Sequence, residues 1–528
     1  MPPFHRFVPS RVRGGRDHKR FRLVTPRRWP RQHWIVSSVI VLVFLTVVSV
    51  TLVVWHPWRQ PPCGRGLIAI GTLRTCVGID LDSTGFTKTD PLADLEDSLV
   101  KQNSTVNRPF GTIVLLDNMT PDSSSDSDNL QALKHRIQGA MAAVWRANNQ
   151  AVAGGTSPNI KLLLANYGSR ADSWREAVEA IKQAAQGEHI VAVSGIGQSL
   201  DTTKQAVAAL SDAGIATVGS VITADDMNTG PDGQHIQNFF RVAPLNTDQA
   251  QAALSYITNH DYQKILLIQD DNRTDSYAQT LSSAFTTAYK SQHKAELDYT
   301  ETYRSPDSKL NGADRDIYMT NQFTKMHSDI CAIQPDLIYF AGRSADLRSF
   351  MKALSEGGAC SLKSLDVMTG DDAADLVGKK IPSSDSLKFR LFYTALAHGD
   401  QWNSFPADSD NRRNYDEFAE AFTKTGFPQS DLTDGLAMMS HDAVLTAAAA
   451  ARQNTQATTD PSTVAAFFLR FRCTNTIPGA SGVIAFGPDG NPIDKSMPIL
   501  QIQPDGSVTQ QDLAWPTGKP LDPMTTCG

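Results

Sequence analysis

Ser199 stands in a setting whose residue types could bind an anion. It follows the apolar run Ile190–Ser194 and the step Gly195-Ile196-Gly197, and a predicted helix begins near Asp201. Glycines allow close approach to the backbone, and the free N–H groups at the start of a helix attract negative charge. The serine hydroxyl adds a donor, so the pattern predicts a carboxylate site. The alternative is that Ser199 or Asp201 merely caps the helix.

Arg343 and several other polar residues also follow short apolar runs. In open α/β sheets, ligands bind outside the carboxyl ends of the strands. At such a position, the Arg343 guanidinium could hold a carboxylate through two N–H groups. The alternative is an ion pair between two parts of the fold or at a helix end. The same rule selects Asn118, Met119, Tyr167–Ser169, Ser220–Thr223, Asp270, Asp271, Tyr277, Gly342 and Gly370–Asp372.

Sequence motifs of enzymes are absent from the chain. It has no GxSxG, HExxH or P-loop motif, and GIGQSL lacks the third glycine of GxGxxG. His441 and Asp442 lie on a predicted helix without an obvious nucleophile, which favours a packed or surface histidine. The acidic run Pro121–Asn129 lacks the ligand spacing and the glycine of an EF-hand. We therefore expect no enzyme activity, no cofactor and no metal site.

Apolar runs alternate with amphipathic helical stretches over some 250 residues. The runs are continuous, as in parallel strands that are covered on both faces, and the alternation predicts a doubly wound α/β fold. The predicted strands are Thr112–Leu116, Ile160–Ala165, Ile190–Ser194, Ile215–Gly219, Lys264–Gln269, Leu337–Phe340 and Leu365–Met368. Predicted helices include Leu130–Asn148, Trp174–Ala185 and Thr202–Ala213, and the two halves of the run meet near Phe239–Pro244.

The composition of the 528 residues is that of a globular protein with an uneven distribution of charge. Hydrophobic residues make up 41% and charged residues 20%, which excludes a fully disordered chain. The formal net charge is −6. Residues 1–33 contain ten Lys and Arg but one acid, Asp17, so the rest of the chain is strongly acidic. An acidic body argues against nucleic-acid binding.

The segment from Trp34 to Trp55 has no charged residue and predicts a transmembrane helix. As a helix it would span about 33 Å, close to the thickness of the hydrocarbon core. Tryptophans favour the two interfaces, and the basic residues before the segment should stay in the cytoplasm. The apolar run is too long for a cleaved signal peptide. We expect an uncleaved single-pass anchor in the cell membrane, with the N-terminus in the cytoplasm and the body outside.

All six cysteines follow this segment, in a compartment that would be oxidising. None forms a CxxC pair, and six cysteines allow 15 pairings. Sequential pairing predicts Cys63–Cys76, Cys331–Cys360 and Cys473–Cys527. The middle pair has a structural argument, because both cysteines precede neighbouring parallel strands, where their Cα atoms can approach closely enough for a bridge. The outer pairs rest on proximity in the sequence and in the terminal region.

Residues of about 110–510 resemble the type I periplasmic binding fold, in its branched-chain amino-acid-binding branch of ABC-transporter receptors. The resemblance rests on the order and spacing of many segments. These include GTIVLLDNMT, VAVSGIGQSLDTTKQAVAALSDAGIATVGSVIT, RVAPLNTDQAQAALSYI, KILLIQDDNRTDSYAQTL, DLIYFAGRSADLRSFMKAL, DVMTGDDAADLVG and SGVIAFGPDGNP. Residues 1–109, with the anchor and a stalk, depart from the usual form of the family.

The resemblance implies two doubly wound parallel-sheet lobes joined by three crossovers, expected near Val242, Leu391 and Ser481. The predicted domains are a basic cytoplasmic head over 1–33, the anchor over 34–55, an extracellular stalk and leading element over 56–109, the two-lobed domain over 110–515 and a tail over 516–528. Lobe 1 would take about 110–243 and 395–470. Lobe 2 would take about 244–390 and 480–515.

The resemblance also implies a ligand between the lobes. Ser199 and Thr223 would hold a carboxylate, while Tyr277 and Asp371 would complete the site on closure. Each has a structural alternative: Thr223 in an ordinary turn, Tyr277 in the core, and Asp371 with Asp372 on a solvated loop. The expected function is to capture an amino acid or a related compound for an ABC permease. The alternatives are a sensing co-receptor with a signalling membrane partner and a cell-surface interaction protein.

Overall fold

The structure is a computed structural model that describes residues 42–43, 63–71, 75–87, 90–121, 129–152, 154–306, 310, 312–357, 360–453 and 460–516. The chain divides into two compact units, Met1–Pro61 and Pro62–Gly528. Of the first unit only Leu42 and Val43 are described, and they are helical and exposed. The rest of the predicted anchor lies outside the described residues, among which no helix combines the length and the apolarity needed to cross a bilayer.

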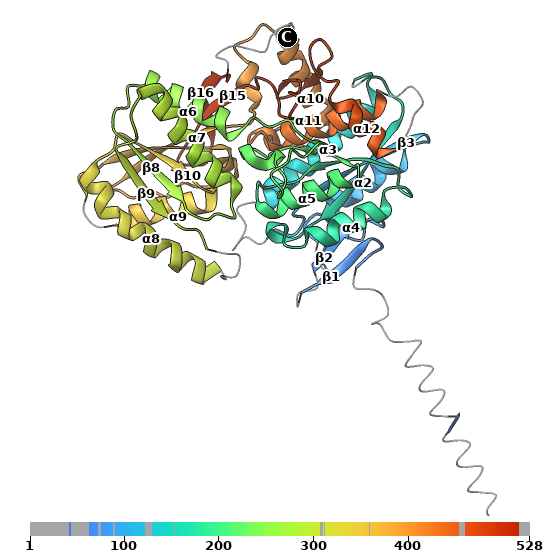
Figure 1. Ribbon diagram of the computed structural model, residues 1–528, viewed down its shortest axis with the longest axis horizontal. Helices are drawn as coiled ribbons and strands as arrows, with labels where there is room; N and C mark the ends of the chain where they lie inside the picture. Colours follow the sequence, from blue (N-terminus) through green and yellow to red (C-terminus); the bar gives the residue numbers. More distant parts are fainter. Residues whose placement is uncertain are drawn as a thin grey trace, which may run out of the picture. The chain divides into compact units, whose positions relative to one another are not determined.

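The second unit is built on two seven-stranded sheets, each at the centre of one lobe (Figure 1). In lobe 1 the strand order is β1-β2-β4-β3-β5-β6-β7. The strands from β4 to β7 are parallel, and β1 and β2 add an antiparallel edge. The bounds are β1 Leu67–Ile70, β2 Thr75–Ile79, β3 Phe110–Asp117, β4 Asn159–Asn166, β5 Ile190–Gly195, β6 Ala216–Gly219 and β7 Phe239–Arg241.

Helices cover both faces of the lobe 1 sheet because its strands are apolar on both sides. On β3, Ile113 and Leu115 pack into a core with α3 and α11, whereas Val114 and Leu116 pack into a second core with α4 and α5. The helices are α2 Ala93–Ser104, α3 Leu130–Asn149, α4 Trp174–Ala184, α5 Asp201–Asp212, α10 Asp410–Lys424, α11 Leu436–Arg452 and α12 Pro461–Phe468. Short 3-10 helices are η2 Ser169–Ala171, η3 Asp225–Asn228, η5 Gly399–Trp402 and η6 Gln429–Leu432.

Lobe 2 repeats the strand order of lobe 1 in its parallel part. Its sheet runs β16-β15-β12-β11-β10-β8-β9, with β15 and β16 antiparallel at one edge. The strands are β8 Ile265–Asp270, β9 Tyr299–Tyr303, β10 Leu337–Ala341, β11 Ser364–Thr369, β12 Lys388–Thr394, β15 Met497–Ile502 and β16 Val508–Ala514. The helices are α6 Asn246–Asn259, α7 Ser276–His293, α8 Gly312–Ile333, α9 Ser344–Glu356 and the 3-10 helix η4 Asp371–Leu376.

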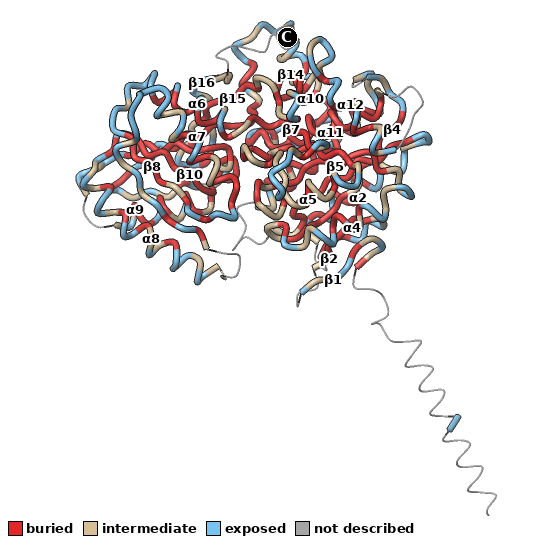
Figure 2. The backbone as a smooth tube through the Cα atoms, viewed as in Figure 1, coloured by how far each residue is buried: buried red, intermediate tan, exposed pale blue. Residues whose placement is uncertain are grey.

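The chain passes between the lobes three times. The first crossover follows β7 at Val242, close to its predicted position. Leu391 lies inside β12, because the apolar run continues to Thr394, so the second crossover begins only after that strand. Ser481 lies in the hairpin of β13 (Ile477–Gly479) and β14 (Gly482–Ile484), and the third crossover runs from the end of β14 to β15. Figure 2 shows buried segments at the centre of each lobe, where β5 and β8 lie, while the edge strands β1, β9 and β16 are more exposed.

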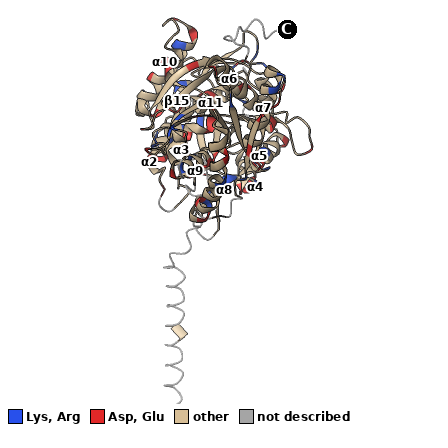
Figure 3. Ribbon diagram, turned by 90° about the vertical axis from the view of Figure 1, so that its left-hand side faces the viewer, with Lys and Arg blue, Asp and Glu red and all other residues tan. Residues whose placement is uncertain are grey.

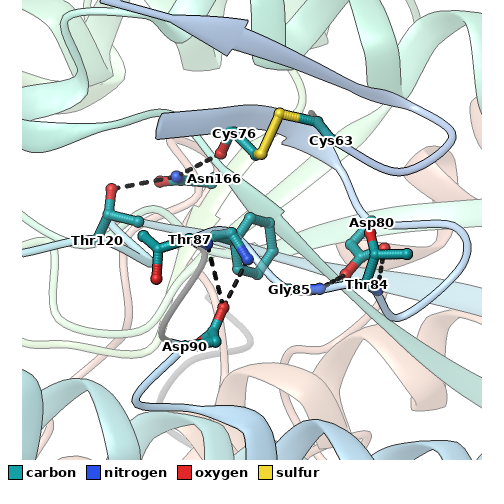
Figure 4. Close-up of a disulfide and its surroundings, with 10 residues drawn as sticks. Cys63, Cys76, Asp80, Thr84, Gly85, Thr87, Asp90, Thr120 and Asn166 are labelled. Atoms are coloured by element: carbon teal, nitrogen blue, oxygen red, sulfur yellow. Dashed lines mark hydrogen bonds between the residues drawn. A yellow bond between two sulfur atoms is a disulfide. The ribbon is translucent and has the colours of Figure 1, made fainter. Parts of the chain in front are cut away.

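The described residues from Cys63 to Pro109 belong to lobe 1, whereas the sequence predicted a stalk and leading element over 56–109. The hairpin of β1 and β2 extends the sheet, and α2 packs against α3. The disulfide Cys63–Cys76 ties the start of this segment to β2 (Figure 4). Asn166 at the end of β4 donates to the Cys76 carbonyl at 2.9 Å, which fixes β2 beside the parallel strands.

A second disulfide confirms the predicted pairing in lobe 2. Cys331 on α8 and Cys360, which follows α9, have Cα atoms 5.6 Å apart and are bonded. The third predicted pair, Cys473–Cys527, stays a prediction because Cys527 lies outside the described residues. In the view of Figure 3, basic and acidic residues are interspersed over the described elements.

Candidate functional site

The five predicted site residues lie at the carboxyl ends of strands on the two facing lobes. Ser199 stands between β5 and α5, and Thr223 follows β6. Across the cleft, Tyr277 lies in the first turn of α7, Arg343 directly before α9 and Asp371 at the start of η4. All five are nearly or fully buried. Sheets of this strand order have their switch points between β3 and β5 and between β8 and β10, the positions at which open α/β sheets bind ligands.

Ser199 does not cap α5, contrary to the alternative for its role. Leu200 is the residue before the helix, and its N–H donates to the Thr203 hydroxyl at 2.9 Å. The Ser199 Oγ instead accepts the N–H groups of Thr223 at 3.1 Å and Ala224 at 3.3 Å. These bonds join two loops of lobe 1 and leave the Ser199 hydroxyl proton for another acceptor.

Arg343 forms the internal ion pair that was the alternative to carboxylate binding. Its Nε and Nη2 donate to the two Asp275 oxygens at 2.8 Å each, and its Nη1 donates to Asp372 at 2.9 Å. The guanidinium also lies 4.5 Å from the centre of the Tyr277 ring. Burial by itself lowers the pKa of Arg343, but the charges of Asp275 and Asp372 outweigh it and raise the pKa well above the usual value.

Asp371 connects the two lobes through hydrogen bonds. Its Oδ1 accepts from the Thr223 hydroxyl of lobe 1 at 3.2 Å and from the Gln249 amide of lobe 2 at 2.8 Å. Burial raises the pKa of Asp371 to about 7, despite the hydrogen bond from Gln249. The carboxyl is thus a group that can change its charge near neutral pH.

Tyr277 contacts both lobes from the first turn of α7, which Asp275 caps by accepting the Ala278 N–H at 3.3 Å. The Tyr277 N–H donates to the Ser199 carbonyl at 3.3 Å, and its hydroxyl accepts the Asp372 N–H at 3.2 Å. Burial, with Asp371 and Asp372, raises the pKa of the phenol well above its usual value. The hydroxyl therefore stays neutral.

A small cavity lies between these residues. Ser199, Tyr277, Arg343 and Asp371 line it, together with residues of both lobes: Arg136, Gly197, Gln198, Val221, Asp372, Ala374, Asp375 and Leu436. Its volume of about 30 Å³ suits about two water molecules. Thr223 does not line it and acts through its bonds to Ser199 and Asp371. A molecule of amino-acid size requires the lobes to separate or the side chains to move.

Several further residues of the site were not selected from the sequence. Asp275 bonds Arg343 from the end of the β8–α7 loop, and Gln249 bonds Asp371 from inside α6, so neither directly follows a strand. Arg136 on α3 pairs with the buried Asp117 at 2.7 Å, and Asn129 donates to Asp375 across the lobes at 3.3 Å. The one available signal was for Asp275, which precedes a helix as a typical N-cap residue.

Two lobes of equal strand order, three crossovers and a polar site between them define the type I periplasmic binding fold. No model of a protein family matches the chain, and no curated protein matches it. Solved structures match at low identity. A leucine-binding protein from Thermotoga maritima is 18% identical, with a TM-score of 0.53, over 76% of this chain and 98% of that chain.

Two other neighbours bind different ligands. A branched-chain amino acid transporter substrate-binding protein from Streptococcus pneumoniae, in complex with isoleucine, is 16% identical over 77% of this chain and 99% of that chain, with a TM-score of 0.52. A solute-binding protein from Rhodopseudomonas palustris, in complex with p-hydroxybenzoic acid, is 11% identical over 78% and 98%, with a TM-score of 0.54. These neighbours are solute-binding proteins of ABC transporters, which are not enzymes. The likeness confirms the resemblance at the level of the fold.

Proposed function

We propose that this chain is a membrane-anchored, extracellular solute-binding protein that captures a small ligand between its lobes and delivers it to an ABC permease. One observation carries the proposal: residues from three separate strand ends of lobe 2 and from the β5–α5 loop of lobe 1 line one polar cavity. Amino acids and related small acids are the first class to test, because structural neighbours bind leucine, isoleucine or hydroxybenzoate.

Ligand binding would shift the equilibrium between an open and a closed arrangement of the two lobes. Ser199 offers a hydroxyl proton from lobe 1, and Asp371 offers a carboxyl from lobe 2. A ligand that contacts both lobes stabilises the closed form by the difference in its affinity for the two forms. The three crossovers are the segments that can take up the rotation.

The test begins with a screen of the full chain in detergent against amino acids and small carboxylic acids. A ligand at 100 times its dissociation constant should add about 2.7 kcal/mol of stability and raise the melting temperature. Calorimetry with Ser199→Ala then checks the site, since a hydrogen bond to a charged group contributes about 1.5–3 kcal/mol. Exposed Ser328→Ala serves as the matched control. A Ser199→Ala variant that binds as tightly as the parent would contradict the site.

The anchor and the permease partner rest on the sequence. The uncharged segment 34–55 and the basic residues before it support a single-pass anchor with the body outside the cell. Copurification with a permease from membranes, against the chain without residues 1–61, tests both together.

A cell-surface interaction protein is a second candidate function, favoured by the Arg343 cluster. Asp275 and Asp372 accept the hydrogen bonds of the Arg343 guanidinium, so this group is not available to a ligand. The cavity beside Arg343 is also small. A screen in which no small molecule stabilises the folded chain would favour this candidate over solute capture.

A further inference from the structure

The donors of Arg343 are engaged on both sides of the cleft. Three of its N–H groups bond the carboxylates of Asp275 and Asp372, which lie on lobe 2 like Arg343 itself. A fourth, on Nη2, donates to the backbone carbonyl of Ser199 on lobe 1 at 3.0 Å. The side chain is 7% exposed. Arg343 thus bridges the two lobes in the place that the resemblance gives to a ligand.

The groups around Arg343 match a guanidinium ion in shape and in charge. The two Asp275 oxygens each accept one hydrogen bond, from Nε and from Nη2, a bidentate pairing that a guanidinium fits and an ammonium does not. The face of Tyr277 lies against the cation, which adds a cation–π contact. The Ser199 carbonyl completes the set with an acceptor from the other lobe. The set thus contains two carboxylates, an aromatic face and a carbonyl.

We propose that Asp275, Asp372, Tyr277 and the Ser199 carbonyl form a guanidinium-binding site that the chain's own Arg343 fills as an internal ligand. The inference rests on the proposed function, because it concerns the same cleft. Arg343 then does not hold the carboxylate of an external ligand. It favours the closed lobes instead, and compounds with a guanidinium group are the class that can replace it.

The test removes the internal ligand and supplies an external one. Arg343→Ala in the full chain should lower the melting temperature, because two buried carboxylates lose their partner. Millimolar methylguanidinium should raise it again by several degrees, while the parent stays unchanged. Tetramethylammonium at equal concentration controls for ionic strength. The melting temperature of the double variant Arg343→Ala, Asp275→Asn should not respond to methylguanidinium. Arg343→Lys should melt at a lower temperature than the parent, and methylguanidinium should not raise it.

Fluorophores at the exposed positions of Lys182 on α4 and Lys325 on α8 report the separation of the lobes. Loss of the charge-assisted bond to Ser199 should shift the closed-to-open ratio about ten- to a hundredfold toward the open form. Methylguanidinium should reverse the shift in Arg343→Ala.

A folded Arg343→Ala variant that ignores methylguanidinium in both measurements would overturn the proposal. If the variant aggregates, refolding with and without methylguanidinium makes the same comparison, and equal yields would overturn it too. The outcome is separate from the proposed function. Rescue of the variant without any ligand for the parent supports the site and rejects solute capture. A ligand that binds the parent, together with no rescue of the variant, supports solute capture and rejects the guanidinium site.

Discussion

Asp371 should make the protein less stable as the pH rises. Burial raises the pKa of its carboxyl to about 7, compared with about 3.9 in an unfolded chain. Between these values the unfolded state loses a proton that the folded state keeps. The free energy of unfolding therefore decreases with pH, by at most about 1.4 kcal/mol per pH unit. Asp371→Asn should remove this decrease, which thermal denaturation from about pH 4 to about pH 7 measures.

The control for Asp371 is the exposed Asp232→Asn, which should keep the pH dependence of the parent. Parallel curves for Asp371→Asn and the parent would show that Asp371 titrates in the folded state as it does in the unfolded chain.

A second residue-scale prediction concerns Asp442, which joins α11 to the β13–β14 hairpin. Its carboxylate is fully buried and accepts bonds from His441 Nδ1 at 2.7 Å and from the Ala480 and Ser481 N–H groups at 2.7 and 2.9 Å. Asp442→Asn places an amide group where only acceptors fit. It should lower the free energy of unfolding by about 3–5 kcal/mol, the cost of breaking a buried charged network. Urea denaturation measures the loss.

Exposed Asp489→Asn is the matched control for Asp442 and should change the free energy of unfolding by less than about 0.5 kcal/mol. Equal stabilities of the two variants would mean that the network is not needed to hold the hairpin. The same network explains His441, whose complete burial confirms that it is a packed histidine.

At the scale of elements, the close packing of α3 against α11 depends on Gly139. A Cβ atom at this position would lie 2.0 Å from the Ala437 carbonyl oxygen, a backbone atom that cannot move by itself. Alanine usually stabilises a helix relative to glycine. Gly139→Ala should nevertheless destabilise lobe 1, by about 1–3 kcal/mol, because the helices must separate.

Gly187→Ala is the control for Gly139, because a Cβ there would meet its nearest atom at an ordinary 3.9 Å. Thermal denaturation compares the two variants. A Gly139→Ala protein as stable as the parent would mean that the two helices can shift without loss.

At the scale of the whole molecule, two truncations of the N-terminus test where the folded body begins. Removal of residues 1–61 follows the division into compact units and should leave the melting temperature unchanged. Removal of residues 1–109 also deletes β1, β2 and α2, and with them the buried Phe86, Leu92 and Leu99. That truncation should fail to fold or should melt far earlier. Equal melting of the two truncations would show that residues 62–109 are a stalk after all.

The sequence alone determined the fold class, because parallel strands that are covered on both faces appear in the sequence as continuous apolar runs between amphipathic helices. Five of the seven predicted runs fall within strands of the two sheets, and the runs at Ile215 and Lys264 start one residue before β6 and β8. The predicted helix Leu130–Asn148 ends within a residue of α3. β9 was missed because it alternates exposed and more buried residues, as an edge strand does. β1 and β2 were missed because they are short and lie in a segment that resembled a stalk.

The tertiary structure decided how the candidate site is built. The strand-end rule found Ser199, Thr223, Tyr277, Arg343 and Asp371, because the order of strands and loops along the chain is a local property. It could not show that Asp275, the N-cap residue of α7, bonds Arg343, or that Gln249 on α6 bonds Asp371. Nor could it show whether Arg343 meets a ligand or a carboxylate of its own chain. Both depend on which distant segments of lobe 2 come within hydrogen-bond distance, which is settled only when that lobe folds.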